Sequence, residues 1–452
     1  MIESLLIANR GEIALRIEKT CIKLGIKPYF VFESADTELP HAKKKDAFQI
    51  SSYMSAEEII SIAKKNSIEA IHPGYGFISE QPKFSKLSEE EGIEFVGPSS
   101  QTMEKLGDKQ KMLMNVSFAN LPRIPGKMVD INDEKAILDA ADELFFPLIV
   151  KGRESGGGRQ IKVNQTKEEL LKSISRLENE EISEVFISKF MTNVKHIEVQ
   201  LLGDKKGKII ALSNRDCSIQ RRFQKLVEEA PSSLPIALQK EIEYTAIRAA
   251  YLGDYLNAGT IEFLVDQQSN YYFMEVNPRL QVEHTVTEEV FGVDLVEWQI
   301  RIASGEEIQM ESDLLKPKGH AIQIRINAED PFNDFSGTTG KITSCIPPSE
   351  SKGYKTRFDT FVYSGITIPA IYDSMIAKLI IYAKNRDIAI KSMLEAIKHT
   401  QIEGIKTTLP FFEGILHHPI FLEANHKTNY LNLYTDDLLK LSTLCSFTLQ
   451  KS

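Results

Sequence analysis

Polar side chains that could bind a cation and an anion occupy every second position from Glu275 to Glu283, within the segment Tyr271 to His284. They are Glu275, Asn277, Arg279, Gln281 and Glu283. The intervening positions, from Tyr272 to Val282, are apolar. Alternate side chains of an extended chain share one face, so the segment predicts a packed face and a face with two carboxylates, two amides and a guanidinium. A half-solvated strand would alternate too, but Asn and Glu are depleted in strands, which favours a functional site.

A second acid lies close by along the chain. Thr260–Val265 has a strand composition, and Asp266–Asn270 has the composition of a turn. A hairpin would place Glu262 opposite Glu275, where the two carboxylates would repel each other unless a cation lay between them. With Asn277 they offer three hard oxygen ligands, which suits Mg²⁺ at about 2.1 Å.

Length and composition limit the class of protein. The chain has 452 residues, too many for one compact core, so two or three domains are expected. The net charge of -9 argues against a nucleic-acid partner. The N-terminus lacks a secretory signal and no apolar run approaches the ~20 residues of a membrane helix, so we expect no membrane partner.

The four cysteines are far apart. Cys21, Cys217, Cys345 and Cys445 show no CxxC spacing. This pattern favours neither a zinc site nor a disulfide framework, and a reducing cytoplasm fits it best.

The first 32 residues predict a doubly wound α/β layer. A strand at Leu5–Ala8 precedes a helix that runs through Cys21 and ends near Gly25, and Tyr29–Phe32 forms the next strand. No GxGxxG follows the first strand, which argues against a nicotinamide or flavin site.

A glycine-rich loop is a candidate for binding phosphate. Residues 152–160, GRESGGGRQ, follow a predicted strand that ends at Lys151. Backbone N–H groups of such a loop can surround phosphate oxygens, and Lys151 together with Lys109 could neutralise a triphosphate. The loop is not a P-loop, and a flexible hairpin tip remains an alternative.

Two further segments leave alternatives open. The run Arg215–Lys225 is cationic within an acidic protein; it is either a solvated turn or, with Arg279, an anion pocket beside the proposed metal. The turn HPGYG at His72 either allows close approach of a ligand or is purely structural. From about Gly319 the chain predicts a β-rich domain that ends in helices at 389–399 and 409–417.

In this order the motifs resemble those of biotin carboxylases, which are ATP-grasp enzymes. They are ANRGEIALRI at Ala8, HPGYGFISE at His72, GDK at Gly107, the loop after Lys151, RDCSIQRR at Arg215, QKLVEEAP at Gln224, EVNPRLQVEH at Glu275, RINAEDP at Arg325 and YDSMIAKL at Tyr372. The resemblance implies a multidomain protein of mixed α/β and α+β class with the ATP-grasp fold. The implied parts are an N-terminal doubly wound α/β domain (1–105), an ATP-grasp domain (106–318) with a mobile lid at about 122–190, a β-rich C-terminal domain (319–446) and a tail (447–452).

The resemblance also implies roles for single residues. ATP would contact Lys109, Lys151, Gly157, Gly158, the hinge residues Ser188, Lys189, Phe190 and Met191, and His196, Gln220, Glu262 and Glu275. Mg²⁺ or Mn²⁺ would bind Glu262, Glu275 and Asn277. Bicarbonate would bind Lys225, Arg279, Gln281 and the Val282 backbone, with Glu283 as general base, and Arg325 would hold biotin. Lys225, Arg279 and Glu283 would be the catalytic residues.

The implied reaction begins with ATP converting bicarbonate into carboxyphosphate, which yields CO₂ and phosphate in a water-poor site. Phosphate would then take the proton from biotin N1′, and Arg279 would stabilise the ureido anion. No Met-Lys-Met biotin-attachment signature is present, so biotin is expected on a separate carrier protein, with carboxyltransferase subunits as further partners and a homodimer as the assembly. Acetyl-CoA carboxylase, and so fatty acid biosynthesis, is the default assignment; propionyl-CoA and pyruvate carboxylases stay open.

Several positions depart from the family pattern. The lid loop carries Arg153, Glu154, Ser155 and Gln160 where small residues are usual, Ser188 replaces a glutamate, and Phe223 replaces a histidine. We hypothesise that these changes lower nucleotide affinity. The alternatives are another ATP-grasp ligase, which would not require the RLQVEH and RINAEDP segments, and a degenerate paralogue that only binds nucleotide or a partner.

Overall fold

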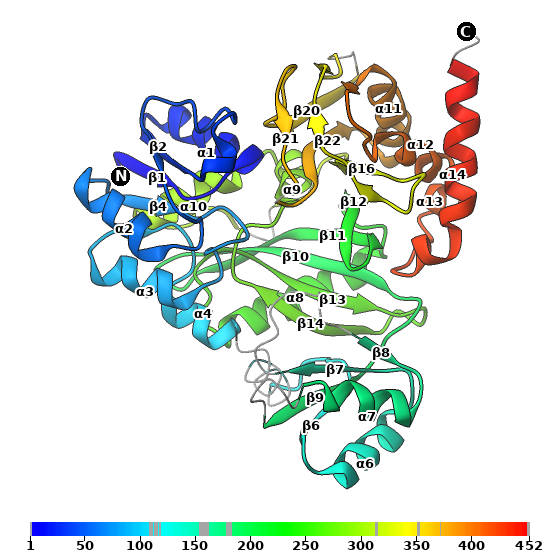
Figure 1. Ribbon diagram of the computed structural model, residues 1–452. Coiled ribbons are helices and arrows are strands. Elements are labelled where there is room, and N and C mark those ends of the chain that lie inside the picture. Colours follow the sequence, from blue (N-terminus) through cyan, green and yellow to red (C-terminus); the bar gives the residue numbers. More distant parts are fainter. Residues whose placement is uncertain are drawn as a thin grey trace.

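The computed structural model describes most of the chain as four connected regions (Figure 1). The described residues are 2–107, 112, 116, 119–152, 162–177, 183–311, 315–349, 353–370 and 372–449, with the backbone alone at 151, 152 and 445–449.

The N-terminal region is a parallel sheet with helices on it. The strand order is β3-β2-β1-β4-β5, and β1 pairs with both β2 and β4 in parallel register. Leu5, Leu6 and Ile7 are completely buried, as expected for a central strand covered on both faces. Helix α1 ends at Gly25, which has the left-handed φ of 72° that favours glycine. The doubly wound layer predicted from the sequence is confirmed. Its elements are β1 (Ser4–Ile7), α1 (Gly11–Leu24), β2 (Lys27–Phe32), the 3₁₀ turn η1 (Ser34–Asp36), β3 (Ala47–Gln49), α2 (Ala56–Lys65), β4 (Ala70–His72), α3 (Pro82–Glu90), β5 (Glu94–Phe95) and α4 (Ser100–Gly107).

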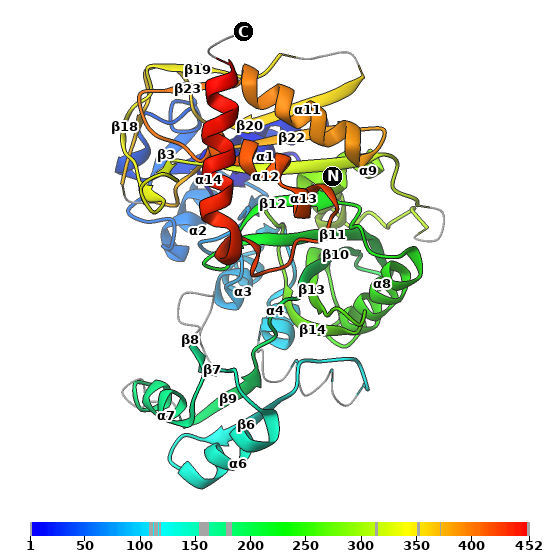
Figure 2. The same ribbon diagram turned by 90° about the vertical axis from the view of Figure 1, so that its right-hand side faces the viewer.

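The segment predicted to be the lid, which we continue to call the lid, forms a small separate layer in its described part, with its own sheet in the order β6-β9-β7-β8. Two helices pack on it through an apolar cluster that includes Ile137, Leu170 and Ile187. Thr166 begins one helix by accepting a hydrogen bond from Glu169 N, and Glu169 in turn accepts from Gln165 N. The lid lies below the rest of the molecule in Figures 1 and 2. Its elements are β6 (Gly126–Asp130), α6 (Glu134–Leu144), β7 (Leu148–Gly152), β8 (Lys162–Asn164), α7 (Lys167–Ser175) and β9 (Glu184–Lys189).

The central region contributes five strands to a large antiparallel sheet. The sheet has eight strands in the order β14-β13-β10-β11-β12-β15-β22-β20. The elements of the central region are β10 (Lys195–Gly203), β11 (Ile209–Arg221), β12 (Gln224–Ala230), α8 (Ile236–Tyr251), β13 (Asn257–Val265), β14 (Tyr271–Asn277), α9 (His284–Phe291) and α10 (Leu295–Ala303).

The C-terminal region completes that same sheet. Strand β15 pairs with β12, so that Glu228 lies opposite Gln323. The sequence predicted a β-rich C-terminal domain but not that its strands continue the ATP-grasp sheet. Its elements are β15 (His320–Asn327), β16 (Glu329–Asp330), β17 (Ser336–Gly337), β18 (Gly340–Lys341), β19 (Ser344–Ile346), β20 (Tyr354–Thr360), β21 (Thr367–Ile368), β22 (Met375–Ala383), α11 (Arg386–His399), β23 (Gln401–Glu403), α12 (Leu409–His417), α13 (Pro419–Leu422) and α14 (Tyr430–Leu449).

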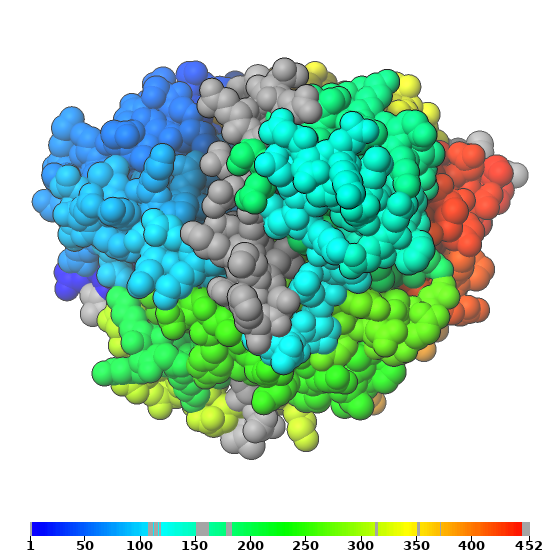
Figure 3. Space-filling view, turned by 90° about the horizontal axis from the view of Figure 1, so that it is seen from below, coloured from blue at the N-terminus to red at the C-terminus, as the bar shows by residue number. Residues whose placement is uncertain are grey.

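Helix α14 stands upright along the right-hand edge of the molecule in Figure 1 and faces the viewer in Figure 2. Seen from below, the lid lies between the N-terminal region on one side and this helix on the other (Figure 3). None of the helices within the described residues has the length and apolar composition needed to cross a bilayer. Cys21, Cys217 and Cys345 are free thiols. The exact domain boundaries given above stay a prediction.

Candidate active site

The predicted hairpin of acidic strands is present. Strands β13 and β14 pair in antiparallel register with Glu262 opposite Glu275 and Thr260 opposite Asn277. The turn between them is closed by a hydrogen bond from Asp266 N to Asn270 O of 2.9 Å. The two acids and the amide therefore lie on neighbouring strands, as the spacing predicted.

The predicted extended alternation beyond Asn277 is wrong. Strand β14 ends at Asn277 and helix α9 begins at His284. Pro278 has no N–H to donate to a sheet ladder, and His284 N bonds to Gln281 O at 3.2 Å, which turns the chain into the helix. Residues 278–283 therefore place their side chains by a turn rather than by strand alternation.

Lys225 is the centre of the site. Its Nζ lies 2.5 Å from Glu198 Oε2, 2.9 Å from Glu262 Oε1 and 2.6 Å from Glu283 Oε1. Burial alone would lower the pKa of Lys225, but the three carboxylates raise it well above its usual value. The ammonium is therefore a permanent cation that draws acids from three strands or turns to one point.

Glu283 is held on its other side by Arg325. Arg325 Nη2 is 2.9 Å from Glu283 Oε2, and its Nε donates to Glu228 Oε1 at 2.5 Å. Burial would raise the pKa of Glu283, but Lys225, Arg325 and Arg215 hold it well below its usual value. Glu283 is thus a carboxylate at neutral pH, with one cation at each oxygen.

A second buried arginine orients Glu198. Arg215 is completely buried, and its Nε donates to Glu198 Oε1 at 2.5 Å. Its Nη1 donates to Gln200 Oε1 at 2.7 Å, and its Nη2 to Thr260 Oγ1 at 3.0 Å. The cationic run therefore does not form a solvated turn as a whole, because Arg215 and Lys225 both face buried carboxylates.

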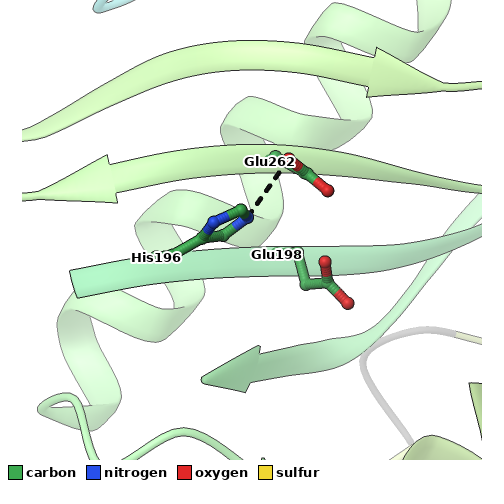
Figure 4. A group of neighbouring side chains, drawn as sticks. All are labelled: His196, Glu198 and Glu262. Carbon is green, nitrogen blue, oxygen red and sulfur yellow. Dashed lines mark ion pairs between the residues drawn. The ribbon is translucent and has the colours of Figure 1, made fainter. Parts of the chain in front are cut away.

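His196 and Gln220 extend the cluster. His196 Nδ1 lies 2.7 Å from Gln220 Nε2, and His196 Nε2 lies 3.1 Å from Glu262 Oε2. Figure 4 shows His196 and Glu262 turned toward each other from neighbouring strands, with Glu198 beside them. Burial opposes ionisation of Glu262, yet Lys225 and His196 lower its pKa below the usual value.

Three sets of side chains are candidates for binding a divalent metal. One of them, Glu198, Cys217 and Glu283, has both of its carboxylates on the Lys225 ammonium. His196, Glu198 and Glu262 offer ligand atoms within 4.8 Å of one another. However, the Lys225 ammonium already contacts Glu198 and Glu262, and it would repel a second cation placed between them. Glu262, Glu275 and Asn277, which the register places on neighbouring strands, provide oxygen ligands only, the donor chemistry that Mg²⁺ prefers; their role as the metal ligands stays a prediction.

Arg279 lies at the N-terminal side of the site. Its Nε is 3.1 Å from Glu80 Oε2, and its Nη2 is 3.4 Å from Asn277 Oδ1. The buried amide nitrogens Asn277 Nδ2 and Gln281 Nε2 have no hydrogen-bond partner among the described residues. Unpaired buried donors are costly, so they indicate a place where a ligand or water accepts hydrogen bonds.

The predicted adenine hinge lies where the lid meets the central region. Ser188 and Lys189 end β9, and Phe190 N bonds to Pro147 O at 2.9 Å. Lys189 Nζ donates to the backbone oxygens of Phe145 and Phe146. Lys109, Gly157, Gly158 and the lid substitutions at 153–155 and 160 lie outside the described residues, as does the side chain of Lys151.

Three residues of the site were missed from the sequence. They are Glu198, Arg215 in its role as a buried counter-ion, and Glu228. A signal for Glu198 was available, because His196, Glu198 and Gln200 alternate with apolar residues in the same way as the segment at Glu275. Glu228 lies within the motif QKLVEEAP, but no local pattern assigns it a partner, because Arg325 comes from another region of the chain.

Comparisons with known proteins identify the family. The family models of the biotin carboxylase N-terminal domain, the carbamoyl-phosphate synthase L chain ATP-binding domain and the biotin carboxylase C-terminal domain match residues 1–103, 108–311 and 323–433. Biotin carboxylase 1 of Bacillus subtilis (strain 168) is 42% identical over 448 residues, which are 96% of this chain and 99% of that protein. This chain belongs to the biotin carboxylase family.

Solved structures of biotin carboxylases share the fold. The biotin carboxylase domain dimer of Hydrogenobacter thermophilus 2-oxoglutarate carboxylase, in complex with MgADP, ADP and bicarbonate, has a TM-score of 0.92 at 37% identity and covers 97% of this chain and 99% of that chain. Campylobacter jejuni biotin carboxylase has a TM-score of 0.90 at 38% identity and covers 96% and 99%. The chain is accordingly an ATP-dependent ligase with the ATP-grasp fold.

Proposed function

We propose that this biotin carboxylase uses ATP and bicarbonate to carboxylate biotin on a separate carrier protein, as the first half-reaction of an acetyl-CoA carboxylase. The observation that carries the proposal is the Glu283 carboxylate, held between Lys225 at 2.6 Å and Arg325 at 2.9 Å. A buried acid between two cations is suited to a reaction in which an anion must be bound and deprotonated.

Bicarbonate would bind between Lys225, Arg279, Gln281 and the backbone of Val282. Two of these side chains carry positive charge, and Gln281 Nε2 is a buried donor without a hydrogen-bond partner in the described part of the chain. An anion bound here would satisfy that donor and share the two cations. The structural relative from Hydrogenobacter thermophilus was solved with bicarbonate.

Glu283 would act as the general base toward bicarbonate. Its low pKa keeps it ionised at neutral pH, although a strongly paired carboxylate is a weak base. When bicarbonate binds, Glu283 and the new anion share the Lys225 ammonium. The proton affinity of Glu283 therefore rises when it must take a proton from bicarbonate. The acid thus gains basicity only with substrate present.

Nucleotide and metal would lie on the other side of Glu262. Glu262, Glu275 and Asn277 would hold Mg²⁺ or Mn²⁺, which neutralises charge on the phosphoryl oxygens during in-line transfer. ATP would extend along His196 and Gln220 to the hinge Ser188–Met191, and Lys109, Lys151, Gly157 and Gly158 would contact its phosphates. This order places the transferred phosphoryl group beside the bicarbonate pocket.

Biotin would bind beside Arg325 and Arg279. Carboxyphosphate formed in the buried site would break down to CO₂ and phosphate, and phosphate would take the biotin N1′ proton. Arg279 would stabilise the ureido anion, because a guanidinium stays charged and donates in a planar fork.

Phosphate release tests the proposal directly. We expect ATP cleavage that requires bicarbonate and increases with free biotin, and we expect Arg279→Ala to abolish the biotin-dependent part. ATP cleavage that ignores bicarbonate and instead depends on an added amine would support another ATP-grasp ligase. No cleavage at all, with nucleotide still bound, would support a degenerate paralogue.

The molecule that finally accepts the carboxyl group has a second candidate. The small subunit of 2-oxoglutarate carboxylase from Hydrogenobacter thermophilus and a pyruvate carboxylase subunit from Methanothermobacter thermautotrophicus are each 39% identical to this chain, over 95% and 96% of it. Transfer of labelled carboxylate to purified carriers from acyl-CoA and 2-oxo-acid carboxylases would decide between them.

We further propose that the protein is a homodimer in the cytoplasm. Sedimentation tests the dimer, and cell fractionation tests the location.

A further inference from the structure

A completely buried lysine lies where three regions of the molecule meet. Lys378 on β22 has no exposed surface. Its Nζ is 3.2 Å from Glu12 Oε2 of helix α1, and it donates to Val282 O of the central region at 3.2 Å. The Tyr75 ring of the N-terminal region has its centroid 5.9 Å from the same nitrogen.

The contact with Glu12 does not by itself explain the lysine. A buried ion pair is often no more stable than two apolar side chains of similar volume. Neither oxygen of Glu12 has a hydrogen bond of normal geometry with any described residue, so the acid balances the charge without fixing its position. The directed contact of Lys378 is the one with Val282 O.

Val282 lies in the segment that the proposed function assigns to bicarbonate. Residues 278–283 form neither helix nor strand, so no sheet ladder sets the orientation of their peptide groups. A donor on Val282 O fixes the plane of the peptide that joins Val282 to Glu283. That plane determines where the Glu283 carboxylate points, and Glu283 must reach both Lys225 and Arg325.

We propose that Lys378 is a positioning residue for bicarbonate and its base. It holds the Val282–Glu283 peptide from outside the substrate pocket, and Glu12 supplies the counter-charge. The inference rests on the proposed function of this segment. It predicts that loss of Lys378 affects bicarbonate and leaves the nucleotide half of the site intact.

The test compares three variants in steady-state phosphate release and thermal unfolding. For Lys378→Met we expect the bicarbonate KM to rise about tenfold, the usual scale of one hydrogen bond from a charged donor, with the ATP KM unchanged. Glu12→Gln/Lys378→Met removes both charges and should recover thermal stability, yet keep the raised bicarbonate KM because Val282 O still lacks its donor. Lys195→Met is the control, since Lys195 is a buried lysine 2.6 Å from Asp216 in a different cluster; it should lower stability without changing the bicarbonate KM.

The outcomes distinguish failure of the inference about Lys378 from failure of the proposed function. If the double variant regains both stability and the wild-type bicarbonate KM, Lys378 acts through folding alone and the inference is overturned. The same conclusion follows if bicarbonate and ATP KM rise together in the variants. If the wild-type protein shows no bicarbonate-dependent ATP cleavage, the proposed function itself fails. Should Lys378→Met be too unstable to assay, the double variant gives the same kinetic comparison.

Discussion

The central sheet and the lid are built from different interactions. The part of the sheet that forms the site contains buried acidic and basic side chains in contact with one another. Lys225 and Arg325 each contact two or more carboxylates from different strands and turns. The described part of the lid is instead a small apolar layer around residues such as Ile187 and Leu170. It meets the central region at its ends, for example where Phe273 N bonds to Pro122 O at 2.8 Å.

This difference teaches which changes the two regions tolerate. An ion network fails when one member is removed, because its partner is left buried and unpaired. An apolar layer can change at its surface while its core persists. The departures from the family pattern at residues 153–160 and Ser188 fall in the lid, whereas the charged constellation of the sheet is complete. We therefore expect chemistry to depend on the sheet and nucleotide affinity to depend on the lid.

The largest expected effect is on the base. Glu283→Gln keeps the shape of the side chain but removes its charge and its ability to accept a proton. We expect kcat for biotin-dependent phosphate release to fall about 10²- to 10⁴-fold, the usual contribution of a general base, with little change in the ATP KM. Glu289→Gln is the matched control, because Glu289 lies six residues further along the chain in helix α9 and pairs with the exposed Lys355. Retention of kcat in Glu283→Gln would show that the sheet network does not carry the chemistry.

Two cavity variants compare the cores of the two regions. Ile324 in the central sheet and Ile187 in the lid are both completely buried. We expect Ile324→Ala to lower the free energy of unfolding of the main body by about 2 to 5 kcal/mol. Ile187→Ala should open the lid locally, so that proteolysis within 122–190 becomes faster and the ATP KM rises while the main unfolding transition moves little. Equal shifts of the main transition would mean that lid and sheet unfold as one unit.

Acid titration separates the ion network from the apolar layer. Glu262 and Glu283 have pKa values lowered from the ordinary 4.5. They therefore add stability that is fully present above that value and is lost as pH falls through the folded-state values. The wild-type urea midpoint should stay level near neutral pH and decrease in acid. In Lys225→Met each of these carboxylates loses one of the partners that lower its pKa, so the loss of stability in acid should be smaller by about 1 kcal/mol than in the wild-type protein. A parallel decline of both proteins would contradict the network.

The sequence predicted the local elements well. The first strand and helix, the acidic hairpin and the helices at 389–399 and 409–417 each depend on short-range periodicity and turn residues, which a sequence displays directly. The pairing of β12 with β15 and the long helix α14 were not predicted. Strand neighbours that are far apart in the chain depend on the whole packing, and α14 has no strong polar and apolar division in its sequence.

The candidate site was predicted in part for the same reason. Glu262 and Glu275 were placed opposite each other because hairpin register follows from the turn between them. The sequence placed Glu283 in the site by an extended alternation that the structure does not have. Pro278 ends the strand, and tertiary contacts with Lys225 and Arg325 orient the acid. Glu228 illustrates the limit: its partner Arg325 is 97 residues away along the chain.

The smallest expected effect concerns Phe223, the substitution at the edge of the nucleotide side. Phe223 is 49% exposed in the turn between β11 and β12, and both Arg222 (φ 51°) and Phe223 (φ 65°) adopt left-handed backbone. Bulky residues rarely take this conformation, whereas Asn and His take it more readily. Arg221 Nη2 bonds to Asp334 O at 2.8 Å and keeps the turn in place. Since the resemblance to the family pattern implies a histidine at this position, we expect Phe223→His to lower the ATP KM about two- to tenfold through one added hydrogen bond, with kcat unchanged. Phe223→Asn relieves the same backbone strain without an imidazole, so it should raise the melting temperature and leave the ATP KM as it is. If both variants lower the ATP KM equally, the turn acts through its backbone, and nucleotide affinity depends on the sheet as much as on the lid.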